Sequence, residues 1–383
     1  MIKVKRTLDL VKNMKNNSYF LFGARGVGKS YLIRETLGGQ IDYIDLLSSK
    51  TFLDLQSSPS NIETYISKKW VVIDEIQRIP ELLNEVHRLI EEKHITFLLT
   101  GSSARKLKRS GVNLLAGRAY KSQLLPLSWR ELVDEKIFKL DTHLHYGGLP
   151  SVVGRDDPSE YLYSYVDTYL KEEIQAEALV RNLSNYARFL DAAALMNGEM
   201  INFTKIANDA QLRPNTVRDY YQILQDTLIG EMLESWTGSV KRKAIQTAKF
   251  YFFDLGVVNT LKKIKVIERN SDTYGKAFEH FIYLELKAYI IYTKNRIRLN
   301  YWRSKNGHEV NFIIDDKIAI EVKATRRISP DDLKGLIALS EENHKWKHLL
   351  IVSEDTQSKI FQQGIIQIHW EEFLKNLWNG KYF

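Results

Sequence analysis

A glycine-rich loop preceded by an apolar run constrains the fold of this chain more than any other feature. Its spacing is GxxxxGK[ST], and it consists of Gly23, Ala24, Arg25, Gly26, Val27, Gly28, Lys29 and Ser30. The run Tyr19–Phe22 before the loop is apolar, and residues 31–37 after it have the composition of a helix. A strand, a tight loop and a helix in this order predict an α/β sheet with a phosphate-binding loop.

Each residue type in this loop suits a polyphosphate ligand. The glycines let backbone N–H groups turn inward where a side chain would clash, and the following helix N-terminus adds partial positive charge. We expect Lys29 to reach the terminal phosphates and the Ser30 hydroxyl to ligate Mg²⁺. ATP and Mg²⁺ are therefore the expected cofactors, with nucleotide contacts from Gly23 to Tyr31. A glycine-rich turn without a ligand is the alternative.

Two adjacent carboxylates follow a second buried strand. The residues Trp70–Ile73 are all apolar, which is typical of a strand buried on both faces, and Asp74 and Glu75 come directly after them. Ligands bind at the carboxyl ends of parallel strands. We expect Asp74 to hold Mg²⁺ through water and Glu75 to orient and deprotonate the attacking water, as in a Walker B motif. The alternative is that both acids only cap the next helix.

A further apolar strand, Ile95–Thr100, leads into Gly101-Ser102-Ser103. A polar residue here matches the sensor position of ATPases that insert an extra strand between the phosphate-loop strand and the Walker B strand. Thr100 or Ser102 is therefore a candidate to hydrogen-bond the γ-phosphate or the water. Arg118 is a candidate arginine finger, acting within the chain or across a subunit interface, with Arg105 and Arg25 as other candidates. Alternatively, Arg118 pairs with a surface carboxylate.

Together these motifs resemble the AAA-type ATPase module of a large prokaryotic family of ATP-binding proteins, whose members carry a C-terminal region of unknown function. The stretches Asp74–Gln77 and Leu125–Ser128 point most directly to this family, and Tyr146–Pro150 also resembles one of its signatures. The resemblance implies a P-loop ATPase domain over residues 1–135. It rests on residues 23–30, 71–77, 100–105, 115–119 and 125–132.

Residues 136–258 predict a helical, winged-helix-like domain. Helices are expected over 161–171 and 186–196, and the segments 201–210 and 214–224 have the pattern of a helix-turn-helix. In that motif Thr204 is expected to cap the first helix, and Asn215 or Thr216 to begin the second. The buried side of the second helix is expected to consist of Val217, Tyr221 and Leu224.

The opposite side of that second helix carries groups that suit DNA. Arg213, Asn215 and Arg218 lie near its N-terminal end, from which side chains of a helix-turn-helix reach a groove. The alternative, which we favour slightly, is a winged helix used for packing or for protein contact.

The last predicted domain, residues 259–383, has the element order of a restriction-endonuclease-like fold. A long helix over 274–294 precedes three strands, a helix, a strand and a last helix. The strands are expected over 298–303, 309–315, 318–325 and 349–353, and the later helices over 331–342 and 370–378. With the first domain, this gives an α/β fold class in which a parallel P-loop sheet is followed by a helical middle and a small α/β domain.

A degenerate nuclease site is the candidate site of that domain. Enzymes of this fold place an acid on one strand and an E-x-K pair on the next, which is Glu321-Val322-Lys323 here. Period two puts Glu321 and Lys323 on one strand face. Asn311 stands where the pattern has an aspartate, and a neutral amide binds a divalent cation weakly. The candidate residues are Glu279, Glu309, Asn311, Glu321 and Lys323; an ordinary ion pair between Glu321 and Lys323 is the alternative.

Composition limits the remaining chemistry. The 383 residues contain no cysteine, which excludes disulfides, zinc ribbons and thiol catalysis. A net charge of +8 mildly favours an anionic partner. Residues 1–6 are basic but no apolar stretch follows them, and no run approaches the roughly 18 apolar residues of a membrane helix. The sequence therefore predicts a cytoplasmic protein without membrane contact.

The leading hypothesis is a Mg²⁺-dependent ATPase that repositions its C-terminal domains on a nucleic-acid or protein partner. A slow nucleotide-gated switch or scaffold is the second hypothesis, and an ATP-regulated nuclease is the third. A homo-oligomer would allow Arg118 to act on a neighbouring subunit.

Overall fold

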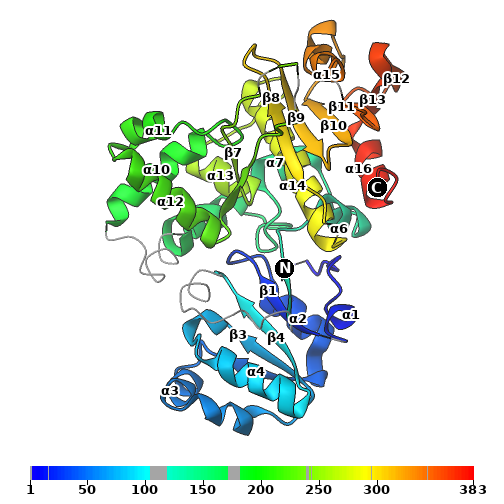
Figure 1. Ribbon diagram of the computed structural model, residues 1–383. Coiled ribbons are helices and arrows are strands. Elements are labelled where there is room, and N and C mark those ends of the chain that lie inside the picture. The colour runs from blue at the N-terminus through cyan, green and yellow to red at the C-terminus, as the bar shows by residue number, and fades with distance from the viewer. Residues whose placement is uncertain are drawn as a thin grey trace.

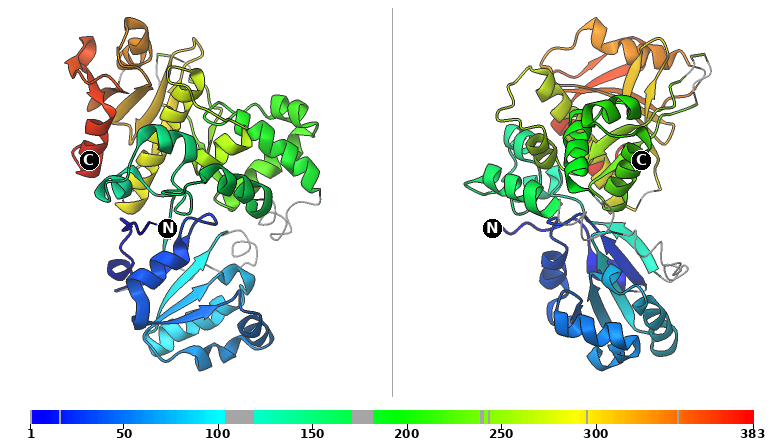
Figure 2. Two further views of the ribbon diagram at one scale, coloured as in Figure 1. Left: turned by 180° about the vertical axis from the view of Figure 1, so that it is seen from behind. Right: turned by 90° about the vertical axis from the view of Figure 1, so that its left-hand side faces the viewer.

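The chain forms two lobes in a computed structural model (Figure 1). The structure describes residues 2–15, 17–103, 119–170, 182–238, 241–242, 244–294, 296–342 and 344–383. The N-terminal lobe holds the first sheet and contains the described elements between residues 10 and 103 and the strand at 119–123, and the upper body contains the elements from residue 129 onward (Figures 1 and 2). The N-terminus lies at the junction between the two (Figure 1).

The first sheet has the strand order β2-β3-β4-β1-β5, and all its pairs are parallel. β4 therefore lies between the phosphate-loop strand β1 and the Walker B strand β3, as the sequence predicts, which confirms the α/β fold class. The strands are β1 Ser18–Phe22, β2 Ile41–Asp45, β3 Trp70–Asp74, β4 Thr96–Gly101 and β5 Ala119–Gln123. The helices of this lobe are α1 Leu10–Met14, α2 Lys29–Leu37, α3 Ser49–Ser57 and α4 Leu82–Lys93, with 3-10 turns at Gly38–Gln40, Pro59–Tyr65 and Ile76–Arg78.

Alternate residues of β1 contribute to two different cores, because successive strand side chains point to opposite faces. Phe20 and Phe22 pack with residues of α4. Tyr19 and Leu21 pack with α1 and α2, in a core that continues into the upper body through Leu149. The N-terminal lobe is thus joined to the rest of the molecule by a continuous apolar core.

The middle of the chain is mostly helical. Its elements are α6 Trp129–Asp134, α7 Leu140–Tyr146, α8 Pro158–Ser164, a π-helical segment Tyr165–Leu170, α10 Leu183–Leu195, α11 Phe203–Ala210, α12 Pro214–Asp226, α13 Leu255–Leu261 and the antiparallel pair β6 Gly230–Leu233 and β7 Lys249–Phe252. Helices α11 and α12 form the predicted helix-turn-helix pair. Val217, Tyr221 and Leu224 are buried, as predicted.

The predicted caps of this pair are wrong. Asn202, not Thr204, caps α11, because its Oδ1 accepts a hydrogen bond from Lys205 N at 2.9 Å. α12 begins at Pro214, with Arg213 at the N-cap, and not at Asn215 or Thr216. Proline suits the first helical position because its φ is preset and its missing N–H has no partner there.

The C-terminal elements build a six-stranded mixed sheet, β12-β13-β11-β10-β9-β8. They are α14 Asp272–Tyr292, β8 Leu299–Arg303, β9 Glu309–Ile314, β10 Ile318–Lys323, a 3-10 turn Pro330–Leu333, α15 Lys334–Ser340, β11 His348–Ser353, β12 Lys359–Ile360, β13 Ile365–His369 and α16 Trp370–Trp378. The edge strand β12 and its neighbour β13 are additions that the sequence pattern did not predict. The domain limits at 135/136 and 258/259 stay predictions.

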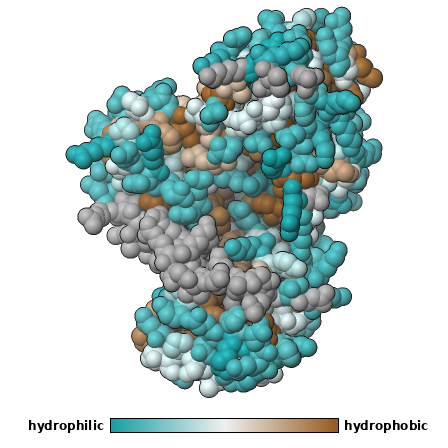
Figure 3. Space-filling view, viewed as in Figure 1, coloured by the Kyte–Doolittle hydropathy of each residue, from teal (hydrophilic) through white to brown (hydrophobic). Residues whose placement is uncertain are grey.

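Helix α14 is the central helix of the upper body. Eleven of its residues are buried, against one face of the C-terminal sheet and against Trp129 of α6 and Leu144 of α7. The other face of that sheet packs against α15. The face in Figure 3 is largely hydrophilic where residues are drawn in colour.

Candidate nucleotide-binding site

The phosphate loop has the backbone that its glycines predict. It connects β1 to α2, and Gly26 and Gly28 have φ of 84° and 92°, a left-handed conformation that strains other residues. A Cβ on Gly23 would lie 2.7 Å from the Leu124 carbonyl oxygen. The glycines are thus required by the path of the chain.

The Lys29 side chain lies across this loop. It is buried, and its Nζ donates to the Gly23 carbonyl oxygen at 2.6 Å and to that of Ala24 at 3.5 Å. Both acceptors are neutral carbonyls, whereas a phosphate oxygen would be a stronger, charged acceptor for the same ammonium. This placement fits the predicted role of Lys29.

Asp74 lies at the end of β3 among three hydroxyl groups. Its Oδ2 accepts from Ser30 Oγ at 3.2 Å and from the Tyr43 hydroxyl, and its Oδ1 accepts from Thr100 Oγ1. Burial and the hydrogen bond to Asp74 raise the pKa of Tyr43 well above its usual range. Because all three donors are neutral, they orient the carboxylate without cancelling its charge. The predicted metal residues Ser30 and Asp74 therefore meet, and hydroxyl and carboxylate oxygens are suitable Mg²⁺ ligands.

Glu75 occupies a strained position beside Asp74. Its φ of 62° and ψ of 45° are left-handed, which is uncommon for glutamate and concentrated at functional sites. Its backbone N donates to Thr100 Oγ1 at 3.2 Å, and its carboxylate accepts from Gln77 Nε2. Gln77 also donates to Ser102 Oγ at 3.2 Å. The structure thus separates the two sensor candidates: Thr100 contacts Asp74 and Glu75 directly, and Ser102 is linked only to Glu75, through Gln77.

Of the three arginine-finger candidates, only Arg25 belongs to the part of the chain that the structure describes. Arg118 and Arg105 lie outside the described residues, so their predicted roles stay predictions. Arg25 belongs to the loop itself, and its carbonyl oxygen accepts from the Tyr165 hydroxyl at 2.8 Å.

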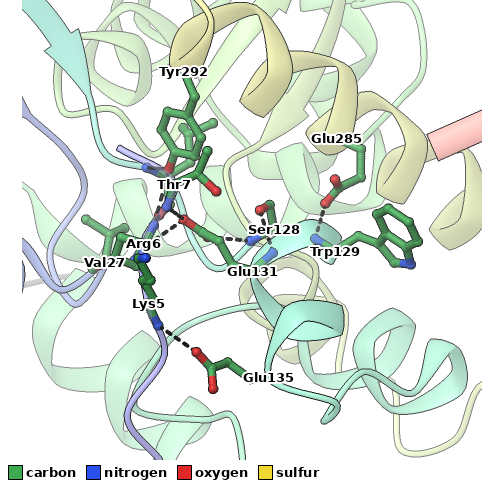
Figure 4. Close-up of polar contacts among 11 residues, drawn as sticks. Lys5, Arg6, Thr7, Val27, Ser128, Trp129, Glu131, Glu135, Glu285 and Tyr292 are labelled. Atoms are coloured by element: carbon green, nitrogen blue, oxygen red, sulfur yellow. Dashed lines mark hydrogen bonds and ion pairs between the residues drawn. The ribbon is translucent and has the colours of Figure 1, made fainter. Parts of the chain in front are cut away.

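A residue that the sequence did not indicate, Arg6, contacts the same loop (Figure 4). Its Nη1 donates to the Val27 carbonyl oxygen at 2.9 Å, and its Nε donates to Glu131 Oε1 at 3.0 Å. Its Nη2 donates to the Leu125 carbonyl oxygen and to the Tyr292 hydroxyl, the latter at 3.2 Å. One buried guanidinium thus contacts the phosphate loop, the segment after β5, α6 and the last residue of α14.

The turn Tyr146–Pro150 is a second connection between the lobes. The Leu127 backbone N donates to the Gly148 carbonyl oxygen at 2.7 Å, and the Gly148 N donates to Asp254 Oδ2 at 2.8 Å. Burial raises the pKa of Asp254 to about 6. A Cβ on Gly28 would lie 3.6 Å from the Pro150 ring. The turn that resembled a family signature therefore packs against the phosphate loop.

The five candidate residues of the C-terminal domain also come together. Glu279, Glu309, Asn311 and Lys323 line a cavity of about 260 Å³ between α14 and the C-terminal sheet. Glu321 lies beside it, with its Oε1 2.8 Å from Lys323 Nζ. Burial raises the pKa of Glu321 to about 7, although Lys323 opposes the shift.

Asn311 has a backbone-bridging role in this cluster. Its Oδ1 accepts from the Val322 backbone N at 2.7 Å, and its own backbone N donates to Glu321 Oε2 at 3.3 Å. Across the described ranges, no group of three or more His, Asp or Glu side chains could hold a metal ion. The cavity is also lined by Lys249, which the sequence patterns did not single out.

Comparison with protein families divides the chain into three matched parts. Residues 15–133 match the model described as an AAA domain. Residues 137–268 and 274–373 match two different domains of unknown function, DUF8612 and DUF4143. An AAA-type domain is therefore followed by two C-terminal domains of unknown function, as the resemblance implied.

Individual relatives are distant. An uncharacterized protein of Methanocaldococcus jannaschii is 24% identical over 82% of this chain and 76% of its own length. A second one from that organism is 22% identical over 95% of this chain and 86% of its own length. Domain III of the Thermotoga maritima replication initiation protein DnaA is 14% identical over 44% of this chain and 81% of that chain, with a TM-score of 0.27. The fold assignment therefore rests on the strand order of the first sheet and on the phosphate loop, not on this similarity.

None of the helices in the described ranges is both long enough and apolar enough to span a membrane.

Proposed function

We propose that this chain, with its AAA domain and two C-terminal domains of unknown function, hydrolyses ATP with Mg²⁺ and passes the nucleotide state to its C-terminal domains. Those domains act on a nucleic-acid or protein partner. The observation that carries the proposal is the Arg6 contact set, in which one side chain joins the phosphate loop to α14.

The chemistry uses residues that already lie together. Ser30 and Asp74 would hold Mg²⁺, which supplies positive charge beside the phosphates when bound. Lys29 donates to the terminal phosphates. Glu75 orients the attacking water and takes its proton, and Thr100 holds the backbone of Glu75 in place. Arg118 remains the candidate for a further positive charge.

The coupling follows from where the loop carbonyls point. The carbonyls of Arg25 and Val27 are bonded to Tyr165 of the middle segment and to Arg6. A phosphate bound by the loop N–H groups reorients these same peptide units, because each unit carries both its N–H and its C=O. Any such movement reaches Tyr165 directly and Tyr292 through Arg6.

The partner is proposed from α12. Arg213 at the N-cap of α12, and Asn215 and Arg218 near the start of the helix, are exposed. If these residues contact DNA, affinity will fall steeply with salt and less steeply in Arg218→Ala, because each lost phosphate contact reduces the slope. A salt-independent result would favour a protein partner.

Nucleotide binding is the first test. Lys29→Ala is expected to abolish binding of a fluorescent ATP analogue, while the exposed Lys12→Ala leaves affinity unchanged. Intact affinity in Lys29→Ala would contradict the assignment of the phosphate loop. Binding without measurable turnover in the wild type would favour the nucleotide-gated switch.

Hydrogen exchange tests the coupling. A non-hydrolysable ATP analogue is expected to change exchange at the end of α14 in the wild type. Arg6→Lys keeps the charge but loses the fork that reaches several acceptors, so this change should shrink although nucleotide still binds. Arg88→Lys, in an ion-pair group on α4, is the control. Exchange changes confined to residues 15–133 would contradict the coupling.

A further inference from the structure

Lys249, at the start of β7, is a buried lysine inside the acidic cavity of the C-terminal domain. Only 3% of its surface is exposed. Its Nζ lies 2.6 Å from Glu309 Oε1 and 3.2 Å from Glu279 Oε1, and 5.3 Å from the centre of the Tyr301 ring. The ammonium is therefore between two carboxylates that come from different elements, β9 and α14.

Two further carboxylate oxygens of the cluster also contact cationic side chains. Glu309 Oε2 accepts from Arg303 Nη1 at 2.8 Å, and Glu321 Oε1 accepts from Lys323 Nζ at 2.8 Å. Three carboxylates are thus matched by three cationic side chains, from Lys249, Arg303 and Lys323. Glu279 Oε1 accepts a further hydrogen bond from the Tyr251 hydroxyl at 2.6 Å.

This arrangement does not fit the divalent cation that a nuclease-like fold implies. Such a cation needs several free oxygen ligands at one point. Asn311 Oδ1 is already bonded to the Val322 backbone N, and the nearest carboxylate oxygens contact ammonium or guanidinium groups. A divalent cation would also lie beside the positive charge of the Lys249 ammonium. Because the stem of Lys249 is buried, the ammonium does not move out into water to make room for it.

We propose that Lys249 is the resident cation of this site: it occupies the place between Glu279 and Glu309 that a divalent cation would need. The domain keeps the carboxylates of a nuclease-like pocket in balance without a metal, and it does not cleave phosphodiester bonds. The absence of cleavage is thus attributed to Lys249 as well as to Asn311.

Mn²⁺ alone, without nucleotide, tests this proposal on the full chain. Lys249→Met keeps the aliphatic stem but removes the charge, so it is expected to create a Mn²⁺ site. Its thermal midpoint should rise when Mn²⁺ is added, and electron paramagnetic resonance should detect bound Mn²⁺. The wild type and Lys276→Met, at the rim of the same cavity, should show neither effect. A Lys249→Met protein that does not respond to Mn²⁺ would overturn the proposal.

A second measurement does not depend on the folding of the Lys249→Met protein. In the otherwise wild-type chain, Glu321→Gln should leave Mn²⁺ binding unchanged, since no ion is bound there to be lost. Bound Mn²⁺ that disappears on Glu321→Gln overturns the proposal. Because no nucleotide is present, neither outcome depends on the proposed ATPase activity.

Discussion

The two acidic sites of this molecule are held by opposite kinds of partner. Asp74 accepts hydrogen bonds from the hydroxyls of Ser30, Tyr43 and Thr100. Glu309, by contrast, lies between Lys249 and Arg303. Hydroxyl donors orient a carboxylate and leave its charge available to a cation, whereas ammonium and guanidinium groups neutralise it. This difference in partners is the reason that we propose Mg²⁺ at the first site and no metal at the second.

We expect the greatest change in the rate of ATP hydrolysis at the site of Asp74 and Glu75. Glu75→Gln should bind ATP but lower the hydrolysis rate by about 100-fold or more, because a general base contributes roughly 10²–10⁴. Phosphate release measures the rate, and the exposed Glu81→Gln is the control. Normal turnover in Glu75→Gln would place the catalytic base elsewhere.

The next effect is on the free energy of unfolding, which can be compared between a variant of Glu309 and a variant of Asp74. Glu309→Gln leaves the buried Lys249 with one carboxylate fewer and should lower the free energy of unfolding by about 3 kcal/mol. Asp74→Asn keeps an oxygen acceptor for the surrounding hydroxyls and should change it by less than about 1 kcal/mol. Denaturant unfolding without nucleotide measures both. Equal losses would remove the contrast.

Glu285 is a further buried carboxylate, and its partners are neutral N–H donors rather than cations. It accepts from the Trp129 backbone N at 2.6 Å and from Trp378 Nε1 at 3.2 Å. Burial raises its pKa to about 8, although these donors oppose the shift. The folded state therefore keeps a proton that the unfolded chain loses above its ordinary pKa near 4.5.

As the pH rises between these two values, the free energy of unfolding should fall by up to about 1.4 kcal/mol per pH unit from this group. Glu285→Gln should remove that dependence, so its stability relative to the wild type should increase with pH. Parallel stability profiles of the two proteins would show that burial does not shift this carboxyl.

The smallest expected effect is in a nicking assay. Because Lys249 and Asn311 leave the C-terminal site without a metal, plasmid nicking with Mg²⁺ or Mn²⁺ should be equal in the wild type and in Lys323→Ala. Activity that disappears in Lys323→Ala would restore the ATP-regulated nuclease.

Local spacing brings out more of the contacts at the phosphate-loop site than at the C-terminal site. The phosphate loop and the acids after β3 are contiguous patterns, and the predicted sheet order brought Ser30, Asp74 and Thr100 together. Tyr43 was missed although it lies on the neighbouring strand β2. Only the strand pairing shows that its hydroxyl faces Asp74.

The residues that connect distant parts of the chain could not be found in this way. Arg6 donates a hydrogen bond to Tyr292, which lies 286 positions later in the chain. Lys249 pairs with Glu309, although Lys249 lies on β7, outside the predicted C-terminal domain. Hydrophobic periodicity defines elements and their buried faces, but it does not encode which charged side chains meet after packing. The E-x-K pattern pointed to Glu321 and Lys323, but it did not indicate Lys249.

The number of Mn²⁺ ions bound per chain in the presence of a non-hydrolysable ATP analogue tests the contrast most directly. We expect one Mn²⁺ ion per chain in the wild type, bound with the nucleotide, and none in Lys29→Ala. A second ion in the wild type, or one that persists in Lys29→Ala and is lost in Glu309→Gln, would contradict it.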